Sequence, residues 1–500
     1  MRNGGKKRRT GLSWALLLLL LSPLAWAGAA ESPGAPLNRL LATPFTGDLP
    51  AMRKRALVRV LVTYNRSNYF LDGARAHGFE YELMEQFRNY LNRKRKKGGL
   101  GIHFIYIPTP FSRLIGDLNA GKGDIIAAGM TITPERQRQV AFSDPYLTGV
   151  AEILVAGPDA EPLHSVDDLA GRQVYLLRGS SYVRHLQRLN GTLAKRGLAP
   201  AVVREVDENL QTEDLLELAS AGVIEYTVAD DHLARLWKDA LPRLRLYPEI
   251  RINSDGRIAW AVRKGNPELL KQLNRFVARH RKGSLLGNIL FRRYYQKNAW
   301  VKNPKRGKER QRFERMKQYF QRYGKAYGFD WLKIAAIAYQ ESELQQSRRS
   351  PVGAIGVMQI KRSTAKDKHV AIDHIERLEN NIHAGVKYLA FLRDRYFSDP
   401  SIAADDRTYF AFAAYNAGPA KVQRMRDLAR KMGLDPDRWF GNVEMAALRL
   451  VGQETVRYVR NILKYYTAYR IAFTSMEKRA GERKSLCRDG KGKDEAACGR

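Results

Sequence analysis

Apolar and polar residues follow two different patterns along this chain of 500 residues. Between Leu57 and Tyr295, short apolar runs of strand length alternate with longer segments of helical period. Strands are predicted at 57–62, 102–107, 123–129, 173–177, 226–229 and 258–262, and helices at 79–91 and 111–120. The first three strands are expected to form one lobe and the next two a second lobe, and at the strand over 258–262 the chain is expected to return to the first lobe. Because such alternation builds open sheets with ligands at the carboxyl ends of strands, we predict an α/β binding domain at residues 54–299.

The second pattern begins at about residue 313 and continues to about 473. Nearly every segment there has helical periodicity, and the longest are at 380–396 and 443–473. A basic linker is expected over about 300–311. The pattern therefore predicts an all-α domain over residues 300–475.

One carboxylate interrupts an apolar stripe of this second domain. With Asp330 as N-cap, helical residues run from Trp331 to about Leu344, and Glu341 falls on the face that should be buried. The apolar members of that face are Ile334, Ile337, Ala338 and Leu344. An anion is expensive to bury, so we expect a raised pKa and a proton donor near neutral pH. The alternative is a solvated glutamate at a helix end.

Both ends of the chain look like additions to these domains. Residues 1–30 have the basic start, the apolar core at Leu12–Leu24 and the small residues of a signal peptide; an uncleaved anchor is the alternative. Residues 31–53, with four prolines, are predicted to be a linker, and residues 476–500 a basic flexible tail. Cys487 and Cys498, the two cysteines, form no metal cluster and are able to close one bridge in an oxidising compartment.

The formal net charge is +35, from 86 Lys and Arg against 51 Asp and Glu. Such a charge favours anionic partners. The chain contains no recognisable nucleic-acid motif, so nucleic acid is not an expected partner, which leaves peptidoglycan and anionic lipid headgroups. An evenly solvated basic surface accounts for part of the charge.

The string that starts at Glu341 and Ser342 and continues through SPVGAIGVMQI at 350–360 resembles the catalytic motif of lytic transglycosylases with the goose-type lysozyme fold. The resemblance implies that Glu341 is the sole catalytic acid and base. Further motifs follow in order, around Asn381, at 410–422 and at 454–459. The residues expected to contact the saccharide are Ser350, Gln359, Tyr415, Asn416, Glu454 and Tyr458. For Glu454, a structural hydrogen bond that holds the catalytic loop is the alternative.

The string from Gly121 to Tyr146 resembles the family 3 solute-binding proteins that capture amino acids, which have a two-lobed periplasmic binding fold. The resemblance implies that Arg136 grips a ligand carboxylate with two parallel bonds. The full set of expected ligand-binding residues is Asn65, Gly129, Thr131, Arg136, Ser180 and Asp230. Asn65 replaces an aspartate that is frequent in that family, and Asp230 has an alternative role as a helix cap.

The order of signal, solute-binding domain and transglycosylase domain resembles the membrane-bound lytic murein transglycosylase F family. This resemblance implies cleavage of the MurNAc–GlcNAc β-1,4 bond of peptidoglycan with 1,6-anhydro-MurNAc ends, without metal or cofactor. It also implies a periplasmic protein, peripheral on the outer membrane, whose first domain recognises cell-wall peptides or amino acids. The alternatives are a hydrolytic lysozyme and a solute receptor whose helical domain binds murein without cleaving it.

Overall fold

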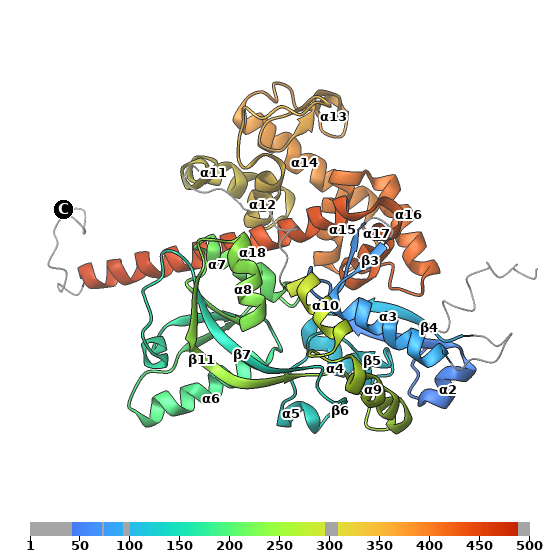
Figure 1. Ribbon diagram of the computed structural model, residues 1–500. Helices are drawn as coiled ribbons and strands as arrows, with labels where there is room; N and C mark the ends of the chain where they lie inside the picture. Colours follow the sequence, from blue (N-terminus) through green and yellow to red (C-terminus); the bar gives the residue numbers. More distant parts are fainter. Residues whose placement is uncertain (1–42, 73–74, 94–100, 296–308, 489–500) are drawn as a thin grey trace, which may run out of the picture.

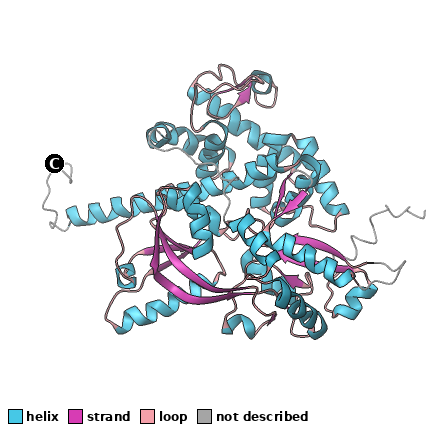
Figure 2. Ribbon diagram, viewed as in Figure 1, coloured by secondary structure: helices cyan, strands magenta, loops and turns pink. Residues whose placement is uncertain are grey.

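The computed structural model describes residues 43–72, 75–93, 101–295 and 309–488. Figure 1 shows an α/β domain below and a helical domain above it, with the long helix α18 (Gln453–Arg488) along both. Figure 2 shows that the strands are concentrated in the α/β domain, as the two sequence patterns predict. The predicted signal peptide, the predicted linker up to residue 42 and Cys498 lie outside the described residues, as does the side chain of Cys487.

The first lobe of the α/β domain is built on a five-stranded sheet. Its strands, in spatial order, are β4 (His103–Pro108), β1 (Leu57–Val62), β5 (Ile125–Ile126), β12 (Ala261–Val262) and β6 (Ala141–Phe142). Its main helices are α3 (Phe79–Asn92), α4 (Leu114–Asn119), α9 (Pro267–His280) and α10 (Leu285–Tyr295). Strand β1 is parallel to β4 and β5, and β12 joins antiparallel to β5 and β6. The predicted return of the chain to this lobe is therefore confirmed.

The second lobe is built on another five-stranded sheet. Its strands, in spatial order, are β11 (Arg245–Ile258), β7 (Leu147–Ala156), β10 (Tyr226–Asp230), β8 (Gln173–Leu176) and β9 (Val202–Glu205). Its helices are α6 (Ser181–Lys195), α7 (Thr212–Ser220) and α8 (Asp231–Ala240). The antiparallel strands β7 and β11 carry the chain between the lobes, which Figure 1 shows as two long arrows side by side. The sequence pattern did not predict either of them.

The helical domain packs α18 against α12 (Trp331–Ser342) and α15 (Ala404–Ala417). Its other helices are α11 (Glu309–Tyr327), α13 (Arg362–Lys366), α14 (Leu378–Tyr396), α16 (Pro419–Lys431) and α17 (Glu444–Val451). A single helix over 443–473 is wrong, because Gly452, at a φ of +79°, separates α17 from α18. Helix α18 continues to residue 488, beyond the predicted start of the tail at residue 476.

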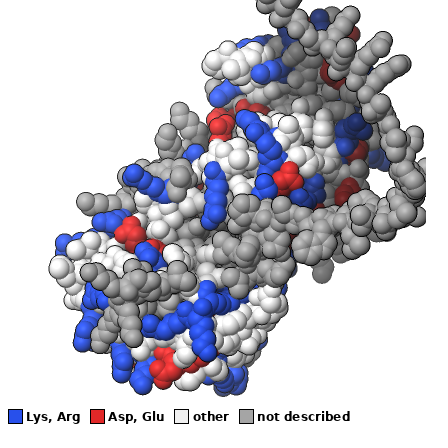
Figure 3. Space-filling model, turned by 90° about the vertical axis from the view of Figure 1, so that its right-hand side faces the viewer, with Lys and Arg blue, Asp and Glu red and all other residues white. Residues whose placement is uncertain are grey.

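Basic side chains are scattered over the face of the molecule seen in Figure 3. Figure 3 shows Lys and Arg spread over one face of both domains, with few acidic side chains between them. This distribution agrees with the net charge of +35. Charge is also present in the core, and part of it is paired.

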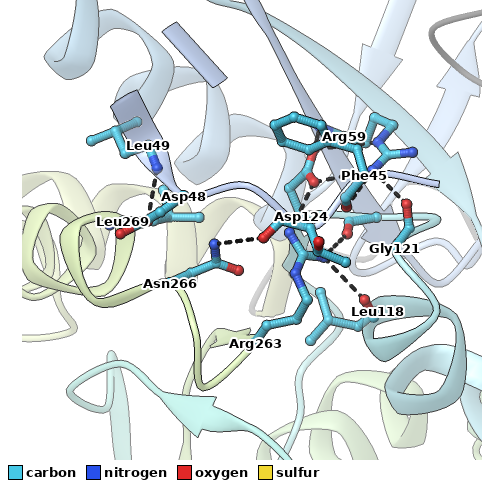
Figure 4. A network of polar contacts seen from close by, with 12 residues as sticks. Phe45, Asp48, Leu49, Arg59, Leu118, Gly121, Asp124, Arg263, Asn266 and Leu269 are labelled. Atoms are coloured by element: carbon cyan, nitrogen blue, oxygen red, sulfur yellow. Dashed lines mark hydrogen bonds and ion pairs between the residues drawn. The ribbon is translucent and has the colours of Figure 1, made fainter. Parts of the chain in front are cut away.

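A buried ion network fixes the start of the first domain. Arg59, in the middle of the apolar strand β1, is fully buried and bonds Asp124, which also receives Arg55 and Arg263 (Figure 4). Arg59 Nη2 donates to the carbonyls of Gly121 at 2.6 Å and Phe45 at 3.2 Å. The three guanidiniums share one carboxylate and also donate to backbone carbonyls, which compensates for their burial.

The predicted linker ends earlier than residue 53, because residues 49–54 form helix α2. Asp48 caps this helix by accepting from Leu49 N at 2.7 Å, and it accepts from Glu268 N and Leu269 N at the start of α9 (Figure 4). Pro50 is compatible with this helix because the first turn needs no donor from it.

Candidate functional site

Glu341 lies near the end of α12. Asp330 caps this helix, since its Oδ1 accepts from Leu332 N at 2.9 Å, as predicted. The predicted apolar stripe is fully buried: Ile334, Ile337, Ala338 and Leu344 are each 0 % exposed. The helix ends at Ser342 because Glu343 and Leu344 adopt positive φ angles of 55° and 59°. Glu341 itself is half-buried.

The Glu341 carboxyl is hydrogen-bonded by a buried tyrosine. Tyr458 Oη, from α18, donates to Glu341 Oε1 at 2.5 Å. Burial raises the pKa of Glu341 to about 7, and the Tyr458 hydrogen bond lowers it by less. Burial, together with the charge of Glu341, raises the pKa of Tyr458 and of Tyr415 well above the usual range, so both hydroxyls stay protonated. The site can therefore hold a proton on Glu341 near neutral pH.

The loop after α12 is held against the neighbouring helices. Ser342 Oγ donates to Val357 O at 2.8 Å, and Tyr415 Oη donates to Met358 O at 2.6 Å. Asn381, fully buried on α14, accepts from Met358 N at 2.8 Å and donates to the carbonyls of Ile355 and Ile375. This positioning role of Asn381 was not predicted, although its motif was recognised.

Gly356 allows this amide to approach. It has a φ of +77°, and a Cβ there would lie 2.4 Å from Asn381 Nδ2. A side chain at Gly356 would therefore displace Asn381 as well as strain the backbone.

Two of the predicted saccharide-contacting residues hold the loop itself. Ser350 Oγ accepts from Ala354 N at 2.9 Å. Gln359, at a φ of +47°, donates from Nε2 to Gly356 O at 2.8 Å. These bonds shape the short hairpin of β13 (Ala354–Ile355) and β14 (Ile360–Lys361) that follows the Glu341 helix.

The other predicted residues lie on α15 and α18. Tyr415 is close enough to Glu341 for the charge of the carboxylate to raise the pKa of the Tyr415 hydroxyl. Asn416 accepts from Thr455 Oγ1 at 2.8 Å. Glu454 lies one turn before Tyr458 but is exposed, and within the described residues its carboxylate has no hydrogen-bond partner. The structure thus brings Tyr415 and Tyr458 to Glu341 and leaves Glu454 at the surface.

A second site lies between the lobes of the α/β domain, in a cavity of about 690 Å³ that includes the solvent at its mouth. Five of the six predicted ligand-binding residues line it: Asn65, Gly129, Thr131, Ser180 and Asp230. Arg136 is not among the lining residues. Its guanidinium donates to Thr131 O at 2.7 Å and, across the lobes, to Gly179 O at 3.0 Å.

One of the expected ligand donors is already used within the protein, and ion pairs join the two lobes. The amide of Gly129 donates to the buried Glu80 at 2.7 Å. Ion pairs cross from the first lobe to the second, between Arg113 and Glu208 and between Glu135 and Arg188. Together with the Arg136–Gly179 hydrogen bond, these ion pairs hold the two lobes in contact.

Helix α18 also contacts both lobes of the first domain. Lys464 pairs with Glu217 of α7, and both side chains are largely buried, at 13 % and 15 % exposed. Arg460, which pairs with the buried Glu444, lies over the Tyr64 ring at 4.6 Å and donates to Asn209 O at 3.5 Å. The helix that carries Tyr458 is thus packed directly on the solute-binding domain.

Comparisons with known proteins agree with this division. Residues 58–296 match the model of bacterial extracellular solute-binding proteins, family 3, and residues 318–435 match the transglycosylase SLT domain. The membrane-bound lytic murein transglycosylase F of Desulfosudis oleivorans is 32 % identical over 438 residues, which cover 83 % of this chain and 90 % of that protein. The protein of the same name from Pseudomonas fluorescens is 29 % identical over 445 residues, covering 84 % of this chain and 85 % of that protein.

Among solved structures, an ancestral arginine-binding protein bound to arginine matches 48 % of this chain and 99 % of its own. Its sequence identity is 26 % and its TM-score 0.40. Within the described part of the chain, no helix combines the length and the apolar character needed to span a membrane.

Proposed function

The chain belongs to the membrane-bound lytic murein transglycosylase F family, and we propose that Glu341 is the group that performs its chemistry. The protein is a peptidoglycan lytic transglycosylase with a solute-binding domain. The observation that carries the proposal is a half-buried carboxyl whose pKa burial raises to about 7, hydrogen-bonded by the buried Tyr458. Such a carboxyl is able both to donate and to recover a proton near neutral pH.

The reaction proceeds with this one carboxyl. Protonated Glu341 gives its proton to the glycosidic oxygen between MurNAc and GlcNAc, and the bond from that oxygen to the anomeric carbon breaks. The resulting carboxylate then takes the proton of the C6 hydroxyl of MurNAc, whose oxygen attacks the anomeric carbon. The product has a 1,6-anhydro-MurNAc end, and no water enters. An attack from within the substrate has the advantage of a high effective concentration.

Tyr458 prepares Glu341 for both steps. Its hydroxyl donates to Oε1, so the second carboxyl oxygen is left to carry the proton. When Glu341 becomes a carboxylate, the same hydrogen bond is charge-assisted and strengthens. Tyr458 therefore stabilises the charge that forms during the reaction.

The saccharide contacts are proposed along the elements that surround Glu341. Tyr415 and Asn416 lie at the end of α15, and Glu454 is exposed on the first turn of α18. Ser350 and Gln359 act through the hairpin loop whose shape they hold. Alanine substitution of each of these residues in turn, assayed on sacculi, tests its contact with the saccharide.

The test compares Glu341→Gln with Glu343→Gln, an exposed glutamate two residues later. Purified proteins are incubated with sacculi, and the released muropeptides are identified by mass spectrometry. We expect anhydro products, lighter by one water than hydrolysed ones, from wild type and from Glu343→Gln, and none from Glu341→Gln. Retained activity of a folded Glu341→Gln would refute the assignment, and hydrolysed ends would indicate a lysozyme.

The solute-binding domain is proposed to recognise cell-wall peptides or amino acids and to regulate the enzyme. Gln211, Thr212 and Glu213, at the start of α7, line the cavity, and Glu217 of the same helix pairs with Lys464 of α18. Tyr458, which holds Glu341, precedes Lys464 by less than two helical turns. Since α18 touches both lobes, a change in lobe closure changes its contacts.

This coupling is tested by titrating stem peptides while turnover on sacculi is followed. We expect the peptide to change the turnover of wild type, and Asp230→Asn, in the cavity, to abolish that response. Lys464→Met should bind peptide like wild type but lose most of the response, because it removes the ion pair with Glu217 that joins α18 to the solute-binding domain. Peptide changes turnover only if such contacts differ in free energy between the two states of the protein. If wild type binds peptide and turnover never changes, the domain only localises the enzyme.

The relatives of this chain are named as membrane-bound, and we propose that this protein acts in the periplasm, on the inner face of the outer membrane. The support is the basic surface of Figure 3, which suits anionic headgroups and peptidoglycan. Fractionation of cells with a marker for each membrane tests the location, and recovery with the inner membrane would contradict it.

A further inference from the structure

The cavity between the lobes is acidic although the protein is strongly basic. The chain has 86 Lys and Arg against 51 Asp and Glu. The described residues that line the cavity nevertheless include two carboxylates, Glu213 and Asp230, and neither Lys nor Arg. His232 is the one basic side chain among these described lining residues, and its ring nitrogen Nδ1 lies 3.8 Å from the Asp231 carboxylate. The lining therefore departs from the rest of the chain in the direction that suits a cation.

Glu213 is buried although it does not cap the helix on which it lies. It is 6 % exposed in the first turn of α7, but the cap of that helix is made by Gln211 and Asp214, with Gln211 N donating to Asp214 Oδ2 at 2.8 Å. Within the described residues the Glu213 carboxylate forms no ion pair. Burial raises its pKa to about 7, against the lowering effects of its own amide, of Ser67 and of the exposed Arg66. A carboxylate in this state gains most from a cation brought by a ligand.

Asp230 and Ser180 lie in the same cavity. Asp230, at the end of β10, is 8 % exposed and accepts from Tyr182 Oη at 3.1 Å, but it also lacks an ion pair within the described residues. Ser180 is 6 % exposed, and its buried Oγ has no hydrogen-bond partner in the described chain. A buried hydroxyl without a partner, on the wall of a cavity, indicates a polar ligand there.

Few donors remain for a ligand carboxylate. The Arg136 guanidinium is bonded by two carbonyls, and the Gly129 amide donates to Glu80. Of the groups expected to receive a carboxylate, the hydroxyls of Thr131 and Ser180 remain. The buried Nδ1 of His232, which has no hydrogen-bond partner within the described residues, also lines the cavity. The balance of charge in the cavity therefore favours a ligand with more cationic than anionic groups.

We propose that this cavity takes a ligand with two cationic nitrogens, such as a diamino acid, free or within a peptide, and that Asp230 and Glu213 each receive one of them. The inference rests on the proposed recognition of cell-wall peptides or amino acids and specifies the chemistry of that ligand. Glu213 then determines specificity, because it distinguishes a diamino acid from a monoamino acid of the same carbon skeleton.

The experiment measures binding to the full chain by calorimetry with two matched pairs of probes. L-Lysine is compared with L-norleucine, and L-ornithine with L-norvaline; each pair differs by one terminal ammonium group. We expect at least one diamino acid to bind at least about tenfold more tightly than its partner, as an ion pair in a desolvated site allows. In Glu213→Gln that ratio should fall below about threefold with the monoamino affinity unchanged. Glu249→Gln, at an exposed residue of the same lobe, should keep the ratio.

Each result decides between the claims. Equal affinities within both pairs for wild type, or a ratio that Glu213→Gln leaves intact, overturn the inference while recognition of amino acids stands. If none of the four probes binds while sacculi are still cleaved, the inference and the recognition of free amino acids both fail. The enzyme assignment then stands, and the stem-peptide titration decides on the recognition of peptides. A melting curve of Glu213→Gln that matches wild type shows that any lost ratio comes from the missing charge.

Discussion

Replacing Glu341 by glutamine should stabilise the protein above neutral pH as well as inactivate it. The pKa of this carboxyl is raised from 4.5 to about 7 by burial. A carboxyl with a raised pKa in the folded state stabilises the fold fully below pH 4.5, and this contribution is lost as the pH rises through about 7. Above that range the ionised group is a cost to folding.

The size of the effect follows from the shift. At about 1.4 kcal/mol for each pKa unit, the Glu341 charge destabilises the folded state by about 3 kcal/mol at pH 8. Glutamine does not ionise, has nearly the same shape and keeps an oxygen that accepts from Tyr458. The free energy of unfolding of Glu341→Gln should therefore equal that of wild type near pH 4.5 and exceed it by about 3 kcal/mol at pH 8.

Denaturant unfolding of both proteins between pH 4.5 and 8.5 measures this difference, with the near-ultraviolet signal of the helical domain as the probe. Glu343→Gln, at an exposed residue, is the matched control and should show no pH-dependent difference from wild type. A difference between Glu341→Gln and wild type that is the same at every pH, or absent at pH 8, would refute the argument that this carboxyl is desolvated in the folded enzyme.

Three further predictions concern the Tyr458 hydrogen bond, the buried ion network around Asp124 and the basic surface. Tyr458→Phe removes the hydrogen bond that lowers the pKa of Glu341, so the alkaline limb of the pH profile of kcat/KM should move up by about one unit; an unmoved limb contradicts this role. Asp124→Ala leaves three arginines without their partner and should lower the free energy of unfolding by about 3 to 5 kcal/mol, whereas Asp117→Ala, at a surface pair, should cost less than about 1 kcal/mol. Binding of the protein to sacculi or anionic vesicles should weaken steeply as salt rises, since exposed charges are screened over about 10 Å at 0.1 M salt; binding that ignores salt indicates a hydrophobic attachment.

Local patterns predicted the elements that local interactions determine. The start of α12 at Asp330 and the end of α15 at Gly418 follow from an N-cap and a glycine. The long strand β11 was not predicted, because its sequence contains Pro248, Asn253, Asp255 and Gly256 and no sustained alternation. It is a strand because β7, which lies far earlier in the chain, pairs with it.

The same limit applies to the functional residues. The motifs placed five of six expected residues in the cavity, yet they gave no sign that Arg136 donates to Gly179 O or that Gly129 donates to Glu80. Both contacts come from residues distant in sequence. Glu213 was missed for a different reason: an acidic residue in the first turn of a helix is ordinary, and its burial is visible only in the fold.

The buried carboxylates of this protein show that a raised pKa alone does not mark a functional group. Burial also raises the pKa of Glu80, but Tyr146, Trp260 and the amide of Gly129 all donate to it, so its oxygens are bonded within the core. The pKa of Glu341 is also raised, but this carboxyl is partly exposed and accepts from one protein donor, Tyr458. The pKa of Glu213 is raised as well, and Glu213 lines a cavity. What separates the three is hydrogen-bonding capacity that the protein leaves unused. A carboxyl with capacity to spare can bind or protonate something else, whereas one whose oxygens are all bonded holds the fold.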